Sequence, residues 1–166
     1  FNAERNISLR MRIGVNSGIS GTLTMLSDAS LTISDPGSLN DNVILVGVAG
    51  VGALMVQSGS DVTVNGGNLG SLEIGLFAGS TGNATFTGAG TTFTANLVNN
   101  GISIGYQGTG TLNIQSGAIA KSLALNAGGN LGGKGFVNVT GAGSQLLLSP
   151  DTGSWSSTPN QGGFLQ

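Results

Sequence analysis

The most constraining feature of this chain is a short segment that occurs five times, a glycine followed by an alternation of apolar and polar residues. Counted from the glycine, the second and fourth positions are apolar in every copy. A period of two is typical of a strand that buries one face. The copies are Gly21–Met25, Gly52–Val56, Gly82–Phe86, Gly110–Ile114 and Gly135–Val139, so the predicted inward columns are Leu23, Leu54, Ala84, Leu112, Val137 and Met25, Val56, Phe86, Ile114, Val139.

A second element precedes each copy, a triplet whose outer two residues are expected to point inward. Its middle residue, as in Arg12, Glu73 and Ser103, is then expected to point to solvent. Glycine follows four triplets and Asn126 follows the fifth, and both residues tolerate a left-handed backbone at a turn. The triplets are Met11–Ile13, Ile44–Val46, Leu72–Ile74, Ile102–Ile104 and Leu123–Leu125.

A third, weaker strand follows each glycine segment. Four copies are Leu31–Ile33, Val62–Val64, Phe93–Ala95 and Leu146–Leu148, and we align the eroded segment Ala118–Ala120 with them. The unit that contains this eroded copy is the shortest, with 21 residues from Ile104 to Leu125 against 33 from Ile13 to Val46.

Three short strands per repeated unit predict an all-β fold, a right-handed single-stranded parallel β-helix (a β-solenoid) of about five coils. The alternative is a β-sandwich of many short strands, which would not require the units to align so uniformly. We expect residues 1–166 to form one solenoid domain. Because Phe164–Gln166 resembles the start of a sixth coil, we expect this domain to be a segment of a longer solenoid.

Composition excludes several classes of partner and chemistry. The net charge is −2, whereas nucleic-acid binding needs a basic patch. No apolar run reaches the roughly 18 residues of a membrane-spanning helix. The chain has no His and no Cys, which excludes Ser-His-Asp and Cys-His catalysis and the common zinc sites. The sequence therefore predicts no catalytic, cofactor-binding or metal-binding residues, and a protein that is not an enzyme.

Four aspartates are the candidates for acidic chemistry in this chain. Asp28 and Asp61 lie in related turns of neighbouring units, as the acids of a carbohydrate-active β-helix enzyme would. Later units have no acidic counterparts, so two solvated turn residues are the better interpretation. Asp35 and Asp41 flank an excursion and are too few for a Ca²⁺ site, so we interpret them as turn caps.

The remaining candidates are basic and aromatic. Arg10 and Arg12 share a strand face, which with Arg5 suggests an anion contact or, more simply, a solvated edge that opposes aggregation. Trp155 and Tyr106 are the single members of their types, and Trp155 is interpreted as packing its own loop. An ice-binding face is rejected because its threonine column is interrupted, reading Thr24, Met55, Thr85, Asn113 and Asn138.

The unit Ile-Gly…Gly-Thr-Leu-x-Ile…Gly-Ala-Gly-Ser resembles the repeats in passenger domains of bacterial autotransporter-type (type V secretion) surface proteins. It is read in Ile104-Gly105, in Gly110–Ile114 and in Gly141–Ser144. This resemblance implies a right-handed β-helix, export to the bacterial surface, and adhesive or structural roles. It carries no catalytic residues over to this chain.

Three functions follow as expectations. The first is an extracellular structural or adhesive β-solenoid that binds a host surface, a glycan or a protein through its long faces. The second is a filament or matrix subunit that self-associates through its end coils. The third is a carbohydrate-active β-helix enzyme.

Overall fold

The structure, a computed structural model, describes residues 10–34, 43–65, 71–96 and 101–148. Its fifteen strands form three five-stranded sheets. Sheet A contains β1 (Arg10–Ile13), β4 (Val43–Val46), β7 (Leu72–Ile74), β10 (Ile102–Ile104) and β13 (Leu125–Ala127). Sheet B contains β2 (Ser20–Met25), β5 (Val51–Gln57), β8 (Thr81–Thr87), β11 (Thr109–Gln115) and β14 (Lys134–Thr140). Sheet C contains β3 (Ser30–Ser34), β6 (Asp61–Asn65), β9 (Thr92–Asn96), β12 (Ile119–Ser122) and β15 (Gln145–Leu148).

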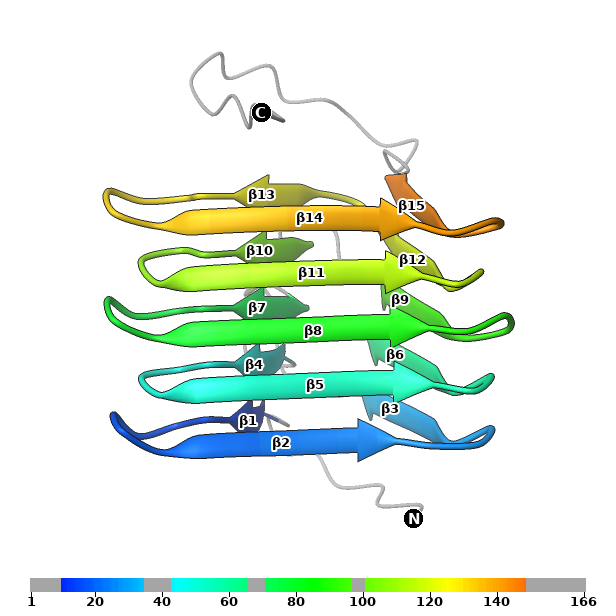
Figure 1. Cartoon of the computed structure of the whole chain (residues 1–166), viewed down its shortest axis with the longest axis horizontal. Coiled ribbons are helices and arrows are strands. Elements are labelled where there is room, and N and C mark those ends of the chain that lie inside the picture. Colours follow the sequence, from blue (N-terminus) through cyan, green and yellow to red (C-terminus); the bar gives the residue numbers. More distant parts are fainter. Residues whose placement is uncertain (1–9, 35–42, 66–70, 97–100, 149–166) are drawn as a thin grey trace.

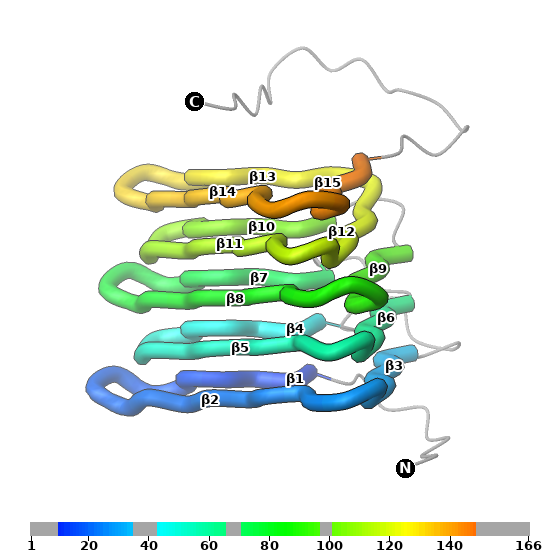
Figure 2. The backbone as a smooth tube through the Cα atoms, turned by 45° about the vertical axis from the view of Figure 1, so that its right-hand side comes forward, coloured from blue at the N-terminus to red at the C-terminus, as the bar shows by residue number. Residues whose placement is uncertain are grey.

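Each coil contributes one strand to each sheet, and every strand pairs in parallel with its equivalent one coil away. The chain passes from sheet A to sheet B to sheet C and winds right-handed as it rises from the first coil to the fifth (Figure 1). The turned view in Figure 2 shows the same stack. This confirms the predicted β-solenoid and excludes the sandwich, whose sheets are antiparallel.

The core lies inside the stack and is built by the predicted columns. In sheet B the glycines and both apolar columns pair in register across all five coils. Ala84 and Phe86 are completely buried, and the Phe86 ring packs on Phe93 of sheet C with their centroids 5.2 Å apart. A large side chain beside a small one in the same coil keeps the core filled. In the fifth coil, by contrast, Val139 is 43% exposed.

Two predicted alignments were wrong, each by two residues. The fifth triplet is Leu125–Ala127 and not Leu123–Leu125, because Ile102 pairs with Leu125. Gly128, with φ +72°, then occupies the turn that was assigned to Asn126, and its N–H donates to Ile104 O. In sheet C, Ala120 and not Ala118 pairs with Phe93.

The prediction that the fourth coil is the shortest is confirmed, with 23 residues from Ile104 to its partner Ala127. The difference lies in the connections from sheet C to sheet A. These span residues 35–42, 66–71, 97–101 and 123–124, and so shorten from each coil to the next. By contrast, the turns from sheet A to sheet B lie entirely within the described residues in all five coils.

Each A-to-B turn begins with a glycine in the left-handed region, and in the first four coils this glycine also packs closely on the next coil. Gly75 has φ +73°, and a Cβ on it would overlap the backbone carbonyl of Thr109 in the next coil and lie 2.9 Å from Gly110 N. Gly79, in the same turn, also has a positive φ but has no atom within 4 Å of such a Cβ. The first glycine is therefore required by packing as well as by backbone conformation.

Candidate functional site

The structure gives Asp28 and Asp61 different partners. Asp28 lies in an exposed turn with φ +56°, and its carboxylate lies against Gly59 in the next coil. Asp61 begins β6, and its carboxylate accepts a hydrogen bond from the Thr92 hydroxyl one coil further on. Asp28 therefore lies in a turn as interpreted, whereas Asp61 belongs to a strand and contacts the next coil through its carboxylate.

Other candidates fall outside the described residues, namely Arg5, Asp35, Asp41, Trp155 and Phe164–Gln166. Within the described ranges, no three Asp or Glu side chains gather closely enough to hold a metal ion.

The outer face of sheet A differs from the expectation of a solvent-exposed middle residue. Arg12 is exposed as predicted, but Leu45, its partner in β4, is only 6% exposed and packs with Val43 and Val48 in a second apolar cluster. The sequence signal was the unbroken run Val43–Val46, since four consecutive apolar residues indicate a strand that is buried on both faces.

Glu73 lies beside this cluster, paired with Leu45. Burial raises the pKa of the Glu73 carboxyl above its ordinary value of 4.5, and the nearby Arg10 guanidinium partly opposes the rise. Desolvation disfavours the charged form of a carboxyl, which is the larger effect here. An acid whose pKa is raised by folding makes the folded state less stable wherever that acid is ionised.

We therefore expect Glu73→Gln to raise the free energy of unfolding at pH 7. The gain should shrink as the pH falls through the raised pKa and should vanish below about 4.5, where the carboxyl is protonated in the folded and unfolded chain alike. Urea unfolding from pH 4 to pH 8 measures it. Asp61→Asn changes the net charge equally on sheet C and serves as the control. A Glu73→Gln variant that is less stable at pH 7 would contradict the expectation.

The outer faces of sheets B and C carry mainly hydroxyl and amide groups. On sheet B, Asn138 donates to Asn113 Oδ1 at 2.8 Å, and Asn113 donates to Asn83 Oδ1 at 3.0 Å, which forms an amide ladder over three coils. The interrupted threonine column, which runs from Thr24 to Asn138, pairs in register as predicted. On sheet C, Thr32, Thr63 and Thr94 form a row that continues to Lys121 and Leu147.

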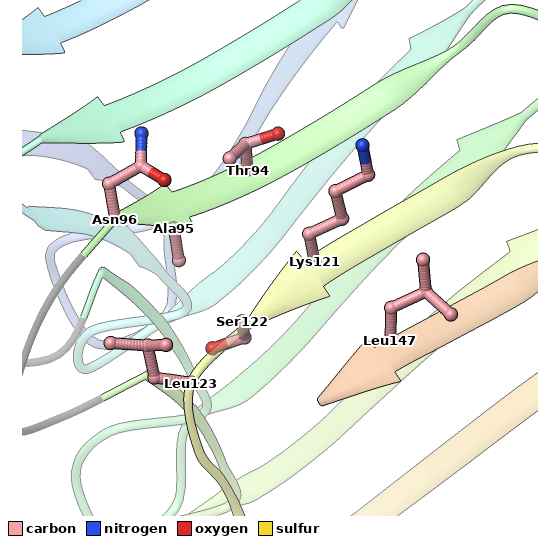
Figure 3. Close-up of a pocket in the computed structure, with 7 residues that line it drawn as sticks. All are labelled: Thr94, Ala95, Asn96, Lys121, Ser122, Leu123 and Leu147. Atoms are coloured by element: carbon pink, nitrogen blue, oxygen red, sulfur yellow. The ribbon is translucent and has the colours of Figure 1, made fainter. Parts of the chain in front are cut away.

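Sheet C also carries a shallow cavity of about 220 Å³. Figure 3 shows that its walls come from β9, β12 and β15 and from the residue that follows β12. The lining residues are Thr94, Ala95, Asn96, Lys121, Ser122, Leu123 and Leu147. Among the described residues that line the cavity, Lys121 is the one charged group.

No helix in the described part of the chain is long and apolar enough to cross a bilayer. Comparisons with protein-family models, with curated proteins and with solved structures give no match for this chain.

Proposed function

We propose that this chain is an extracellular structural or adhesive β-solenoid of a bacterial surface, and that it binds through its long faces. The observation that carries the proposal is the hydrogen-bonded series of amide side chains on the outer face of sheet B over the third, fourth and fifth coils, formed by Asn83, Asn113 and Asn138. Such groups offer donors and acceptors at a repeat of about 4.8 Å on a rigid frame. Many weak contacts of this kind add up through multivalency.

The resemblance of the repeats to autotransporter passenger domains supports a location at the bacterial surface. A non-enzymatic role is supported by the separate partners of Asp28 and Asp61. A glycoside hydrolase of the usual kind would need two carboxyl groups facing one bound sugar.

Replacement of Asn83, Asn113 and Asn138 by alanine tests the face directly. We expect the triple variant to remain folded by circular dichroism and to lose binding to glycan arrays and to cell surfaces by about tenfold or more, since each lost contact is repeated along the rod. The matched control replaces Thr32, Thr63 and Thr94 on sheet C. An unmodified protein that binds no glycan, protein or cell surface would refute the adhesive role.

A second candidate, self-association through the end coils, is favoured by the fifth coil. Val139 and Leu148 occupy inward columns yet are 43% and 46% exposed, whereas Met25 and Ile33 in the first coil are buried. Electron microscopy tests it, because end-to-end association makes rods longer than one molecule. Particles that all have the length of a single solenoid would contradict this candidate.

A further inference from the structure

The cavity on sheet C lies where two neighbouring strands separate. β9 pairs with β6 along all five of its residues, but it pairs with β12 along only the first three. The connection from β12 to β13 has two residues, 123–124, while the connection from β9 to β10 has five, 97–101. The fourth coil therefore leaves sheet C early. The residues that follow the last pair on the two strands line the cavity, namely Ala95, Asn96, Ser122 and Leu123.

This separation leaves two backbone groups at the cavity without the partners that a continued ladder would supply. Ile119 N–H donates to Thr91 O at 3.0 Å, and in a parallel pair such bonds recur at every second residue. Four residues further on, the series would join Leu123 N–H to Ala95 O. Among the described residues, Leu123 N–H donates to no backbone carbonyl. A backbone N–H or C=O that leaves a sheet needs another partner, so the cavity offers one donor and one acceptor to a bound molecule.

A buried serine holds the bend of the fourth coil in place. Ser122 is 4% exposed, and its hydroxyl donates to Ala124 O at 2.8 Å. Ala124 O also accepts from Ile102 N–H of the preceding coil at 2.9 Å. Because the short connection is tied both to β12 and to β10, Leu123 is held in position before any ligand arrives, and binding loses little conformational entropy.

The side chains at the cavity add one cation and an apolar surface. Lys121 is exposed, whereas the described carboxyl groups, those of Asp28, Asp61 and Glu73, belong to the first three coils and do not line the cavity. Figure 3 shows the Lys121 and Leu147 side chains on the same side of the sheet and the Ala95 side chain pointing to the other. A mostly apolar concave site with a few placed polar groups is typical of small-molecule binding.

We propose that this cavity binds a small α-hydroxy carboxylic acid in its ionised form. The carboxylate accepts hydrogen bonds from the Lys121 ammonium group and from Leu123 N–H. The hydroxyl group on the neighbouring carbon donates to Ala95 O, and the apolar remainder of the acid packs on Leu147. Charge-assisted bonds of this kind are about twice as strong as neutral ones, so the carboxylate contributes most to the affinity.

The size and place of the cavity agree with such a ligand. Its volume of about 220 Å³ equals that of about seven water molecules at roughly 30 Å³ each, which suits an acid of a few carbon atoms. The cavity uses no amide of the ladder on sheet B, so this proposal stands independently of the proposed function.

Titration of the isotope-labelled protein with α-hydroxyisovalerate, followed by nuclear magnetic resonance, tests the site. We expect the backbone amide signal of Leu123 to shift and to saturate, with a Kd on the order of 1 mM. Isovalerate lacks the hydroxyl group and α-hydroxyisovaleramide lacks the charge, so each should bind about tenfold more weakly or worse. A Leu123 signal that does not shift, or equal affinity for the three compounds, would overturn the proposal.

A sugar acid is the alternative ligand that the same titration excludes. Glucuronate carries a ring oxygen, not a hydroxyl group, on the carbon beside its carboxyl group, so it cannot donate to Ala95 O from that carbon. We expect it to bind more weakly than α-hydroxyisovalerate. Tighter binding of glucuronate would show that the cavity is a sugar site and would refute the proposed class of ligand.

Substitution of Lys121 tests the role of its charge. Lys121→Gln is expected to raise the Kd of α-hydroxyisovalerate by about tenfold or more, whereas Lys121→Arg retains the charge and should retain binding. Lys134→Gln is the matched control, since it removes the same charge from an exposed lysine of β14 on sheet B. Equal weakening by Lys121→Gln and Lys134→Gln would mean that only the net charge matters, and the site would be wrong.

Discussion

Replacing Phe86 by alanine is expected to lower the free energy of unfolding by about 3–5 kcal/mol, the range for removing a buried aromatic side chain. Phe86 is completely buried in the third coil, with coils on both sides, and packs on Phe93 of the neighbouring sheet. The adjacent inward residue, Ala84, is too small to fill the space that would be left. The cavity therefore persists, and its cost adds to the lost transfer free energy. Urea unfolding followed by far-ultraviolet circular dichroism measures the loss.

Phe136→Ala is the matched control, because it removes the same atoms from a residue that is 52% exposed on the outer face of sheet B. Its cost should be below about 1 kcal/mol, since few of its contacts are buried. Equal losses for the two variants would show that Phe86 does not lie in the core.

The second large effect is expected from Gly75→Ala, with a loss of more than about 4 kcal/mol, a size that points to a specific structural conflict. The new methyl group would overlap the Thr109 carbonyl, and backbone atoms of a hydrogen-bonded turn cannot move aside without separating two coils. The midpoint of thermal unfolding and the midpoint of urea unfolding both measure this loss of stability.

Gly79→Ala separates this overlap from backbone strain. Gly79 has a φ of +80°, similar to that of Gly75, but open space surrounds the position of its Cβ. The variant should therefore lose only the conformational cost of a left-handed alanine, about 1–2 kcal/mol. If both variants lose the same free energy of unfolding, the third and fourth coils do not approach each other as closely as the structure shows.

Most of the fold could be predicted because the same pattern of residues occurs in five copies. Glycine, apolar, polar and apolar residues in fixed order fix both the strand and its inward face, and columns such as Met25, Val56, Phe86 and Ile114 pair as expected. Both misalignments occurred where the pattern is weakest, near Leu125 and Ala120. A shift of two residues returns every side chain to the same face, so apolar alternation does not reveal it.

The surfaces could be predicted only in part, because they depend on contacts between coils. The raised pKa of Glu73 arises from burial, and Leu45 of the partner strand lies beside it. Nothing in the triplet Leu72–Ile74 itself signals this. The turns from sheet A to sheet B alternate between six and four residues from coil to coil. This alternation did leave a signal in the sequence, since the distance from the glycine after the triplet to the glycine of the next strand is seven residues or five. That signal becomes meaningful only once the turns are known to stack on one edge.

The alternation of turn lengths makes a pair of coils the smallest module that can be exchanged without altering the outline of the rod. Deleting one of the three middle coils would bring two turns of equal length together, although every inward column would remain intact. Deleting two consecutive coils would shorten the rod by about 10 Å and preserve the outline. The length of the rod can therefore be changed without changing its surface profile only by adding or removing an even number of coils. This applies to shortening, extending or splicing the scaffold.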